Sequence, residues 1–177
     1  MTFQELLQRL AAEFDSEILL DAHPAARDPW IEVAPAHVET VARFLKTDPS
    51  LRFDSLCDLT GVDYFEPDPK LAAKFPFEPH LEVVYHLQSI QFKHRLTMKA
   101  KLPRWKEGIE GQLPEIPTVS NVWAIADWHE REAFDLVGIH FTGHPNLVRI
   151  LCVEDWVGHP LRKDYAFPLE YHGVRGR

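Results

Sequence analysis

The chain has 177 residues, of which 45% are hydrophobic and 26% charged, and its net charge is −8. This composition is typical of a folded globular protein and excludes a largely disordered one. The acidic balance argues against non-specific binding to nucleic acid or to an anionic membrane surface, so we expect no nucleic-acid partner. A chain of this length forms one domain, or one domain with an appendage.

The sequence carries no signal of a membrane span or of a targeting peptide. No apolar run approaches the roughly 18–20 residues that a membrane-spanning helix needs. Residues 1–14 have the pattern of an amphipathic helix with acidic side chains, which differs from a signal peptide and from an arginine-rich transit peptide. These features favour a bacterial cytoplasmic protein.

Hydrophobic periodicity and turn residues predict the first elements. Thr2 and Glu5 have the spacing of a capping box, and Pro35 suits the first turn of a helix. Residues 66–79 and 102–119 gather prolines and are expected to be loops. In chain order we expect a helix over 2–14, strands over 17–21 and 30–33, a helix over 35–48, a strand over 51–62, and a hairpin with strands over 81–87 and 92–98.

One strand of the expected hairpin carries a row of basic side chains. We place this row on one strand face, opposed by Glu82 of the other strand, and interpret it as a solvated sheet face in preference to a docking surface. The basic residues are Lys93, Arg95, Lys99 and Lys101.

Residues 127–165 hold charge, glycine, proline and tryptophan more densely than the rest of the chain, and they begin with a short helix. We expect Asp127 as its N-cap, with Glu130 completing a capping box, and Gly138 as the left-handed residue that ends it. Arg131 and Asp135 are four residues apart and can pair. The polar side chains expected on its surface are Glu130, Arg131, Glu132 and Asp135.

The segment from residue 139 onward has neither a helical nor a strand period. Gly143 to Pro145 and Gly158 to Pro160 predict turns. Because the segment is too apolar to lie wholly in water, we expect it to lie on a partner. The mixed charges of residues 162–164 beside Trp156 and Tyr165 are typical of an interface.

No pattern of catalytic or metal-binding residues is visible. His140 and His144 are four apart, but Gly143 and Pro145 break any helix that would align them, so we expect His144 and His159 to fix turns. The chain lacks G-x-S-x-G, GxGxxG and phosphate-loop motifs. One disulfide between the isolated cysteines, Cys57 and Cys152, stays open, but we expect both to be small buried hydrophobes. Cluster ligands would be grouped in the sequence, so we do not expect these cysteines to hold a cluster. We expect no catalytic, cofactor-binding or metal-binding residue on this chain.

The residues alone predict an α+β fold, with helices packed on a mixed, largely antiparallel sheet. We place this domain at residues 1–119. Residues 120–177 are expected to supply a helix and an extended C-terminal segment that lies on a partner subunit.

The motifs of the second half resemble the C subunit of the proton-pumping NADH:quinone oxidoreductase, respiratory complex I, whose mitochondrial counterpart is the 30-kDa subunit. The stretches that carry the resemblance are Glu130 to Glu132, Asp135 to Ile139, Gly143 to Pro145, Arg149 to Leu151 and Gly158 to Tyr165.

This resemblance implies a structural subunit that binds no redox centre itself, in a complex that uses FMN, iron–sulfur clusters and quinone. The implied partners are chiefly the D subunit, which helps form the quinone site, and also the B and I subunits. The implied location is peripheral, on the cytoplasmic face of the bacterial membrane, as part of the complex. The residues expected at the interface between subunits are Glu130, Arg131, Glu132, Asp135, Gly138, His144, Pro145, Arg149, Trp156, Gly158, His159, Pro160, Leu161, Arg162, Lys163, Asp164 and Tyr165.

Two alternatives remain at this stage. Membrane-bound [NiFe] hydrogenases and F420H2- or ferredoxin-linked dehydrogenases contain homologous subunits, and the chain could serve one of these. A free-standing enzyme that uses Glu130, His144 or Asp164 belongs to a different class, and it would turn over substrate as the purified chain alone.

Overall fold

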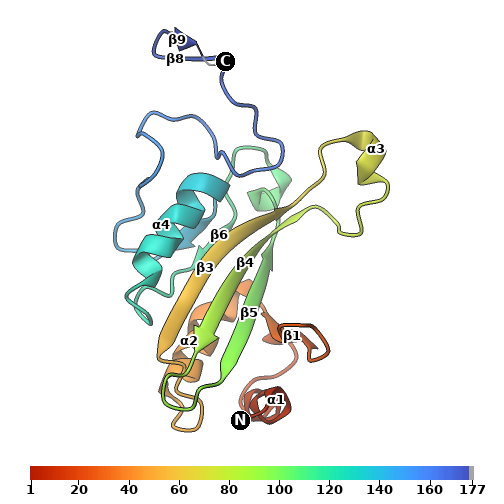
Figure 1. Cartoon of the computed structure of the whole chain (residues 1–177), viewed down its shortest axis with the longest axis vertical. Helices are drawn as coiled ribbons and strands as arrows, with labels where there is room; N and C mark the ends of the chain where they lie inside the picture. Colours follow the sequence, from red (N-terminus) through yellow and green to blue (C-terminus); the bar gives the residue numbers. More distant parts are fainter. Residues whose placement is uncertain (176–177) are drawn as a thin grey trace.

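A five-stranded mixed sheet forms the centre of the computed structural model, which describes residues 1–175. The strand order is β1-β2-β5-β4-β3 (Figure 1). Strands β2 and β5 are parallel and the other neighbours are antiparallel, which confirms the predicted α+β fold and its largely antiparallel sheet. The strands are β1 (Leu19–His23), β2 (Trp30–Val33), β3 (Ser55–Tyr64), β4 (His80–Gln88) and β5 (Arg95–Leu102).

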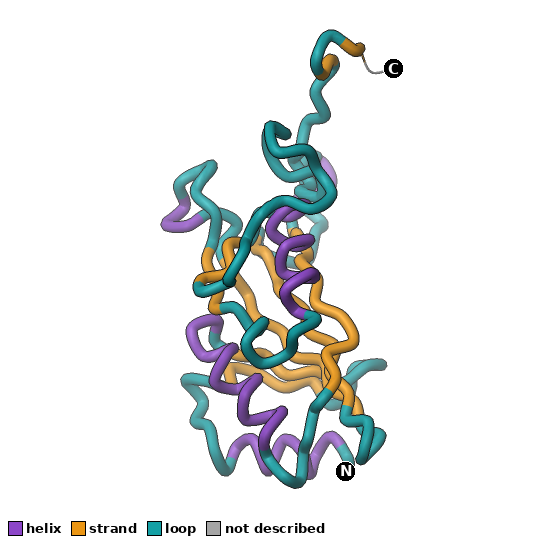
Figure 2. Tube along the Cα trace, turned by 90° about the vertical axis from the view of Figure 1, so that its left-hand side faces the viewer, coloured by secondary structure: helices purple, strands orange, loops and turns teal. Residues whose placement is uncertain are grey.

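Helices cover one face of this sheet. Figure 2 shows α2 and α4 on the same side of the strands, and no helix of residues 1–175 covers the opposite face. The helices are α1 (Phe3–Ala11), α2 (Val38–Thr47), α3 (Pro69–Ala72) and α4 (Ala126–Val137), with 3₁₀ turns η1 (Pro35–His37) and η2 (Lys106–Gly108). Two small sheets complete the fold: β6 (Glu115–Pro117) parallel to β7 (His140–Thr142), and β8 (Glu170–Tyr171) antiparallel to β9 (Val174–Arg175).

The first two helices begin and end largely where local chemistry predicts. The capping box is present at α1: Glu5 accepts from the Thr2 backbone N–H at 2.8 Å, and the Thr2 hydroxyl accepts from the Glu5 N–H at 3.3 Å. This helix ends at Ala11, before the expected residue 14. Pro35 opens a 3₁₀ turn that leads into α2, and Asp48 follows the last residue of α2. The Asp48 carboxylate accepts from Arg9 at 2.7 Å, which ties α1 to the end of α2.

One hydrophobic core includes side chains from both sides of the predicted boundary at residues 119 and 120. Tyr85 and Phe53 are fully buried, and Trp123 donates its indole N–H to the Phe53 carbonyl at 2.9 Å. Helix α4 packs closely on β3, because a Cβ at Gly61 would stand 3.2 Å from the Cβ of Val137. Residues 1–119 and the start of residues 120–177 therefore share their packing.

Several local predictions need correction. The loop at 66–79 contains the short helix α3, and the loop at 102–119 contains β6. Lys93 lies in the hairpin turn with φ +55°, so it does not belong to the basic row on β5. Cys57 is exposed instead of buried, because its side chain points to the open face of the sheet, and Cys152 is half-buried. Among the described residues, no helix combines the length and the apolar character needed to cross a bilayer.

Candidate docking segment and its anchor on helix α4

The C-terminal end of α4 is capped by residues 159–162 of the C-terminal segment. Gly138 adopts the left-handed conformation (φ 75°, ψ 56°) and ends the helix, as predicted. The last carbonyls of a helix have no partner within it. Here the Asp135 carbonyl accepts from His159 Nδ1 at 3.0 Å, and the Leu136 carbonyl accepts from the Leu161 N–H at 2.8 Å. Burial lowers the pKa of His159, which favours the neutral ring with its proton on Nδ1.

Arg162 completes this cap. Its Nε donates to the Val137 carbonyl at 2.9 Å, and its Nη2 donates to the Gly138 carbonyl at 3.3 Å and to the Arg104 carbonyl at 2.9 Å. The guanidinium stacks 3.7 Å from the ring centroid of Trp105. Burial lowers the pKa of Arg162 to about 10, so the group stays charged at neutral pH and favours the helix C-terminus.

Arg162, which the sequence predicts at the interface between subunits, is buried within the chain. The residue is only 6% exposed, and its polar contacts lie within the chain. The same holds for Asp135, Gly138 and Glu130, which are buried. These motif residues build the segment's own fold, and a contact of theirs with a partner stays a prediction.

A network of ion-paired side chains fixes residues 163 and 164 of the segment to the sheet. Arg104 donates to both oxygens of Asp63 at 2.8 Å and to Asp164 at 2.8 Å. The Lys163 backbone N–H donates to Asp63 at 2.9 Å. The roles of Asp63 and Arg104 are not visible in the sequence, because nothing in their local sequence indicates a partner so distant along the chain.

Asp135 anchors the loop at 149–152. One carboxylate oxygen accepts from three backbone N–H groups, and the other accepts from Arg149 Nη1 at 2.6 Å. The three donors are Ile150 at 3.0 Å, Leu151 at 2.7 Å and Cys152 at 2.9 Å. Burial alone would raise the pKa of Asp135, but these donors lower it to about 2. The expected pair with Arg131 is therefore wrong, and Arg131 donates instead to the Val148 carbonyl at 3.2 Å.

The glycines of the motif allow close contacts with its rings. A Cβ at Gly138 would stand 2.5 Å from the imidazole of His159, and one at Gly158 would stand 2.8 Å from the ring of Tyr165. Both glycines also have positive φ, which L side chains rarely adopt. The glycines, His159 and Tyr165 are therefore parts of one packing arrangement.

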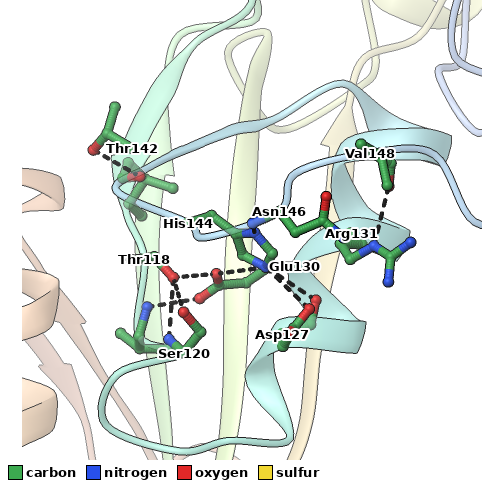
Figure 3. Close-up of polar contacts among 11 residues, drawn as sticks. Thr118, Ser120, Asp127, Glu130, Arg131, Thr142, His144, Asn146 and Val148 are labelled. Atoms are coloured by element: carbon green, nitrogen blue, oxygen red, sulfur yellow. Dashed lines mark hydrogen bonds and ion pairs between the residues drawn. The ribbon is translucent and has the colours of Figure 1, made fainter.

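Glu130 lies in the core instead of capping α4 (Figure 3). The helix begins at Ala126 without a side-chain cap, so the predicted capping box of Asp127 and Glu130 is wrong. Glu130 accepts from the Thr118 hydroxyl and from the Val119 N–H, the latter at 2.7 Å. Glu130 therefore ties the helix to residues 118–119, which directly follow β6.

His144 packs against the same carboxylate from the turn at 143–146. Its Nε2 lies 3.9 Å from Glu130 and 3.4 Å from the Asp127 carboxylate, and its Nδ1 accepts from the Asn146 N–H at 3.0 Å. The predicted role of His144 in fixing its turn is thus confirmed. Burial raises the pKa of Glu130 to about 7. The negative charge of Asp127 also raises this pKa, whereas the hydrogen bonds from Thr118 and Val119 lower it.

The outer surface of the C-terminal segment is apolar. Val157 is 85% exposed and Leu161 is 57% exposed. A shallow groove beside them is formed by Trp156, Pro160 and Phe167, together with Leu136 of α4. Further exposed apolar residues of this surface are Val148, Leu151, Val153 and Leu169. We call the apolar residues of 148–169 the docking surface, because exposed apolar side chains are typical of a contact with another protein, and this contact stays a prediction.

The remaining predicted interface residues are on the surface of the molecule. Glu132, Pro145 and Lys163 are exposed. No group of three or more His, Cys, Asp or Glu side chains in residues 1–175 is arranged to hold a metal ion.

Comparison with known proteins gives consistent matches. A family model described as "Respiratory-chain NADH dehydrogenase, 30 Kd subunit" matches residues 31–171. The C subunit of NADH-quinone oxidoreductase from Roseiflexus castenholzii is 43% identical over 165 residues, which cover 93% of this chain and 84% of the relative. The C subunit of the same enzyme from Coxiella burnetii is 38% identical over 188 residues, with 94% and 78% covered.

A solved structure shares the fold. A chain of the membrane-bound sulfane sulfur reductase, an archaeal respiratory membrane complex, aligns with a TM-score of 0.68 at 20% identity and covers 92% of this chain and 85% of its own length.

Asp135→Asn tests the anchor of the 149–152 loop. The lowered pKa of Asp135 means that the charged carboxylate stabilises the fold above about pH 4, and that this contribution is lost as the pH falls toward 2. We expect the substitution to reduce the free energy of unfolding by about 2 kcal/mol at pH 7 and by much less near pH 2. Urea denaturation at both pH values measures this. Asp28→Asn, at an exposed position, is the control, and equal losses at the two pH values would contradict the assignment.

Glu130→Gln tests the buried carboxyl. Because the folded pKa of Glu130 is raised to about 7, the wild type loses stability as the pH rises from about 5 to 8. Gln keeps the shape of the side chain without its charge. We therefore expect the free energy of unfolding of the variant, relative to that of the wild type, to rise by up to about 3 kcal/mol over this pH range. Unfolding curves at pH 5 and pH 8 check this, with the exposed Glu132→Gln as the control. A variant that shows the same pH dependence as the wild type would sink the prediction.

Gly138→Ala tests the contact with His159. We expect a loss of about 2–4 kcal/mol in unfolding free energy, from the left-handed backbone and from the collision with the imidazole. Gly111→Ala is a matched control, since Gly111 has φ +88° and its Cβ would meet nothing within 4 Å. If both variants lose the same stability in urea denaturation, the ring contact contributes nothing.

Proposed function

Because the chain belongs to the family of the 30-kDa subunit of respiratory-chain NADH dehydrogenase, we propose that it is a structural subunit in the peripheral arm of a proton-translocating NADH:quinone oxidoreductase. The resemblance of its motifs to the C subunit is thereby confirmed. NADH oxidation by quinone, coupled to proton transfer, is the activity of the assembly. FMN, the iron–sulfur clusters and quinone then belong to other subunits.

The observation that carries this proposal is the division of the C-terminal segment into an inner and an outer side. Asp135, Arg149 and Arg162 hold the inner side through hydrogen bonds within the chain. The outer side presents the docking surface, with Val157 and Leu161 exposed. A rigid backbone that presents apolar side chains loses little conformational entropy on binding, which suits a scaffold.

We assign the docking surface chiefly to the D subunit, and expect contacts with the B and I subunits elsewhere. In this role the chain supports the fold of the D subunit beside the quinone site. It would be peripheral on the cytoplasmic face of the membrane, held there by the complex.

A scaffold role agrees with how the buried polar groups are used. Glu130 and Asp135 accept hydrogen bonds from the chain itself, so neither carboxylate opens into a pocket as an acid or base. This favours a subunit without catalysis over a free-standing enzyme that uses Glu130, His144 or Asp164.

The related complexes are the second candidate. The shared fold with a chain of the archaeal sulfane sulfur reductase supports a place in a complex of that kind. The sequence relatives at 38% and 43% identity are named as C subunits of NADH-quinone oxidoreductase, which favours the NADH-linked complex.

The test is purification of the tagged chain from gently solubilised membranes of its host. We expect the wild type to bring along subunits that contain FMN and iron–sulfur clusters and oxidise NADH. Val157→Lys should abolish this recovery while the melting temperature stays unchanged, because Val157 is almost fully exposed. Ile90→Lys, at another exposed apolar position in the hairpin turn, is the control. Recovery of a [NiFe] subunit, or of the chain alone, would contradict the proposal.

A further inference from the structure

The last described residues form a small hairpin at the upper end of the molecule, beyond α4 (Figure 1). Strand β8 pairs antiparallel with β9, and Tyr171 lies opposite Val174. The two residues between them, His172 and Gly173, have φ of +49° and +78°, and a two-residue hairpin turn of type I′ requires positive φ at both positions. A two-stranded hairpin is marginally stable at best on its own, so its position depends on contacts with the rest of the chain.

Asp155 and Trp156 of the docking segment provide such contacts. Asp155 Oδ1 accepts from the Tyr171 hydroxyl at 2.6 Å, and Asp155 Oδ2 accepts from His172 Nε2 at 2.7 Å. The hydrogen bonds from Tyr171 and His172 lower the pKa of Asp155, so its carboxylate is charged at neutral pH. The ring centroids of Tyr171 and Trp156 are 5.2 Å apart. We call these contacts of Asp155 and Trp156 with the hairpin the clasp.

The clasp completes the groove of the docking surface. This groove has a volume of about 380 Å³, and Tyr171 lines it together with Trp156 and Phe167. None of the eight residues that line it carries a charged side chain, so the groove suits a large apolar side chain. Val157 and Leu161, which are exposed, belong to the same docking surface, so a subunit that covers them would also reach the groove.

The clasp can open in the free chain. The side chains of His172 and Asp155 are 63% and 57% exposed, and an ion pair in this setting stabilises a fold little, because water competes for both partners. A side chain in the groove contacts Tyr171 only when the hairpin is closed. Its binding therefore favours the closed state over the open one.

We propose that the hairpin is a strap that closes beside a large apolar side chain of the neighbouring subunit when that side chain enters the groove. Asp155 is then a positioning residue, because it acts through the hairpin and not by contact with the partner. The partner is taken from the proposed function, on which this inference rests. A hairpin that blocked the groove would fill it, whereas Tyr171 lines the groove and leaves its volume open.

The test is a competition between two copies of the full chain for the assembled complex. The host expresses the wild type and a variant with different tags, and mass spectrometry compares their ratio in the purified complex with their ratio in the cell. Asp155→Ala should lower the share of the variant about fivefold, as for the loss of one hydrogen bond. Glu154→Ala, at the neighbouring exposed carboxylate, should leave the share unchanged.

Two further readouts separate the clasp from a general effect of Asp155. In a chain that already carries Tyr171→Phe and His172→Ala, Asp155→Ala should cause no further loss, because the hairpin donors of the carboxylate are gone. In the free wild-type chain, NMR should detect the contact between the rings of Trp156 and Tyr171. Asp155→Ala should weaken this signal, and Glu154→Ala should not.

Photo-cross-linking identifies the side chain that enters the groove. p-Benzoylphenylalanine replaces Phe167, which lines the groove and is 67% exposed, and we expect a cross-link to an apolar residue of another subunit. A cross-link to a second copy of this chain, no cross-link at all, an equal or larger share of Asp155→Ala, or a further loss in the triple variant would overturn the inference. Each of these results leaves the proposed function standing if the wild type enters the complex. Failure of the wild type to enter it would overturn both.

Discussion

The unpaired carbonyls at the end of α4 are the constraint on which the C-terminal half depends. A helix leaves its last carbonyls without partners, and a buried end must find donors elsewhere. Here the donors are His159, the Leu161 backbone and Arg162, all from a segment that has no regular structure of its own. Because Gly138 turns the chain away in the left-handed conformation, the segment can return over the helix end. The helix thus gives an irregular segment a fixed course.

Two buried carboxyl groups on the same helix have pKa values that are shifted in opposite directions, because they differ in their hydrogen-bond donors. Asp135 receives three backbone N–H groups and an arginine, which outweigh its burial, and its pKa falls to about 2. Glu130 has fewer donors and accepts from no arginine, so burial prevails and its pKa rises to about 7. Asp135 therefore stays charged as an anchor, whereas Glu130 ties α4 to residues 118–119 with a carboxyl group that titrates near neutral pH.

The side chains that remain exposed after these internal contacts form are the ones available to partners. Within the C-terminal segment, Arg149 and Arg162 bond to the chain itself, whereas Val157 and Leu161 are exposed, so the docking surface offers apolar area more than ion pairs. A groove on the open face of the sheet has a different character, because ion-paired side chains such as Glu82 and Lys99 line it together with the aromatic rings of Trp30 and Tyr64.

The sequence by itself determined the features that depend on residues close together along the chain. These are the capping box of Thr2 and Glu5, strand β2, the β4–β5 hairpin, and the helix end at Gly138. Each depends on periodicity or on hydrogen bonds between residues a few positions apart. The tertiary structure alone decided the partners of the charged side chains. Glu130 has the spacing of a cap, yet it bonds to Thr118 and Val119, and Arg162 resembles a surface residue, yet it lies buried against Val137 and Arg104. The reason is physical, because a buried charge is stabilised by whichever donors or acceptors the fold brings near it, and sequence spacing does not reveal these.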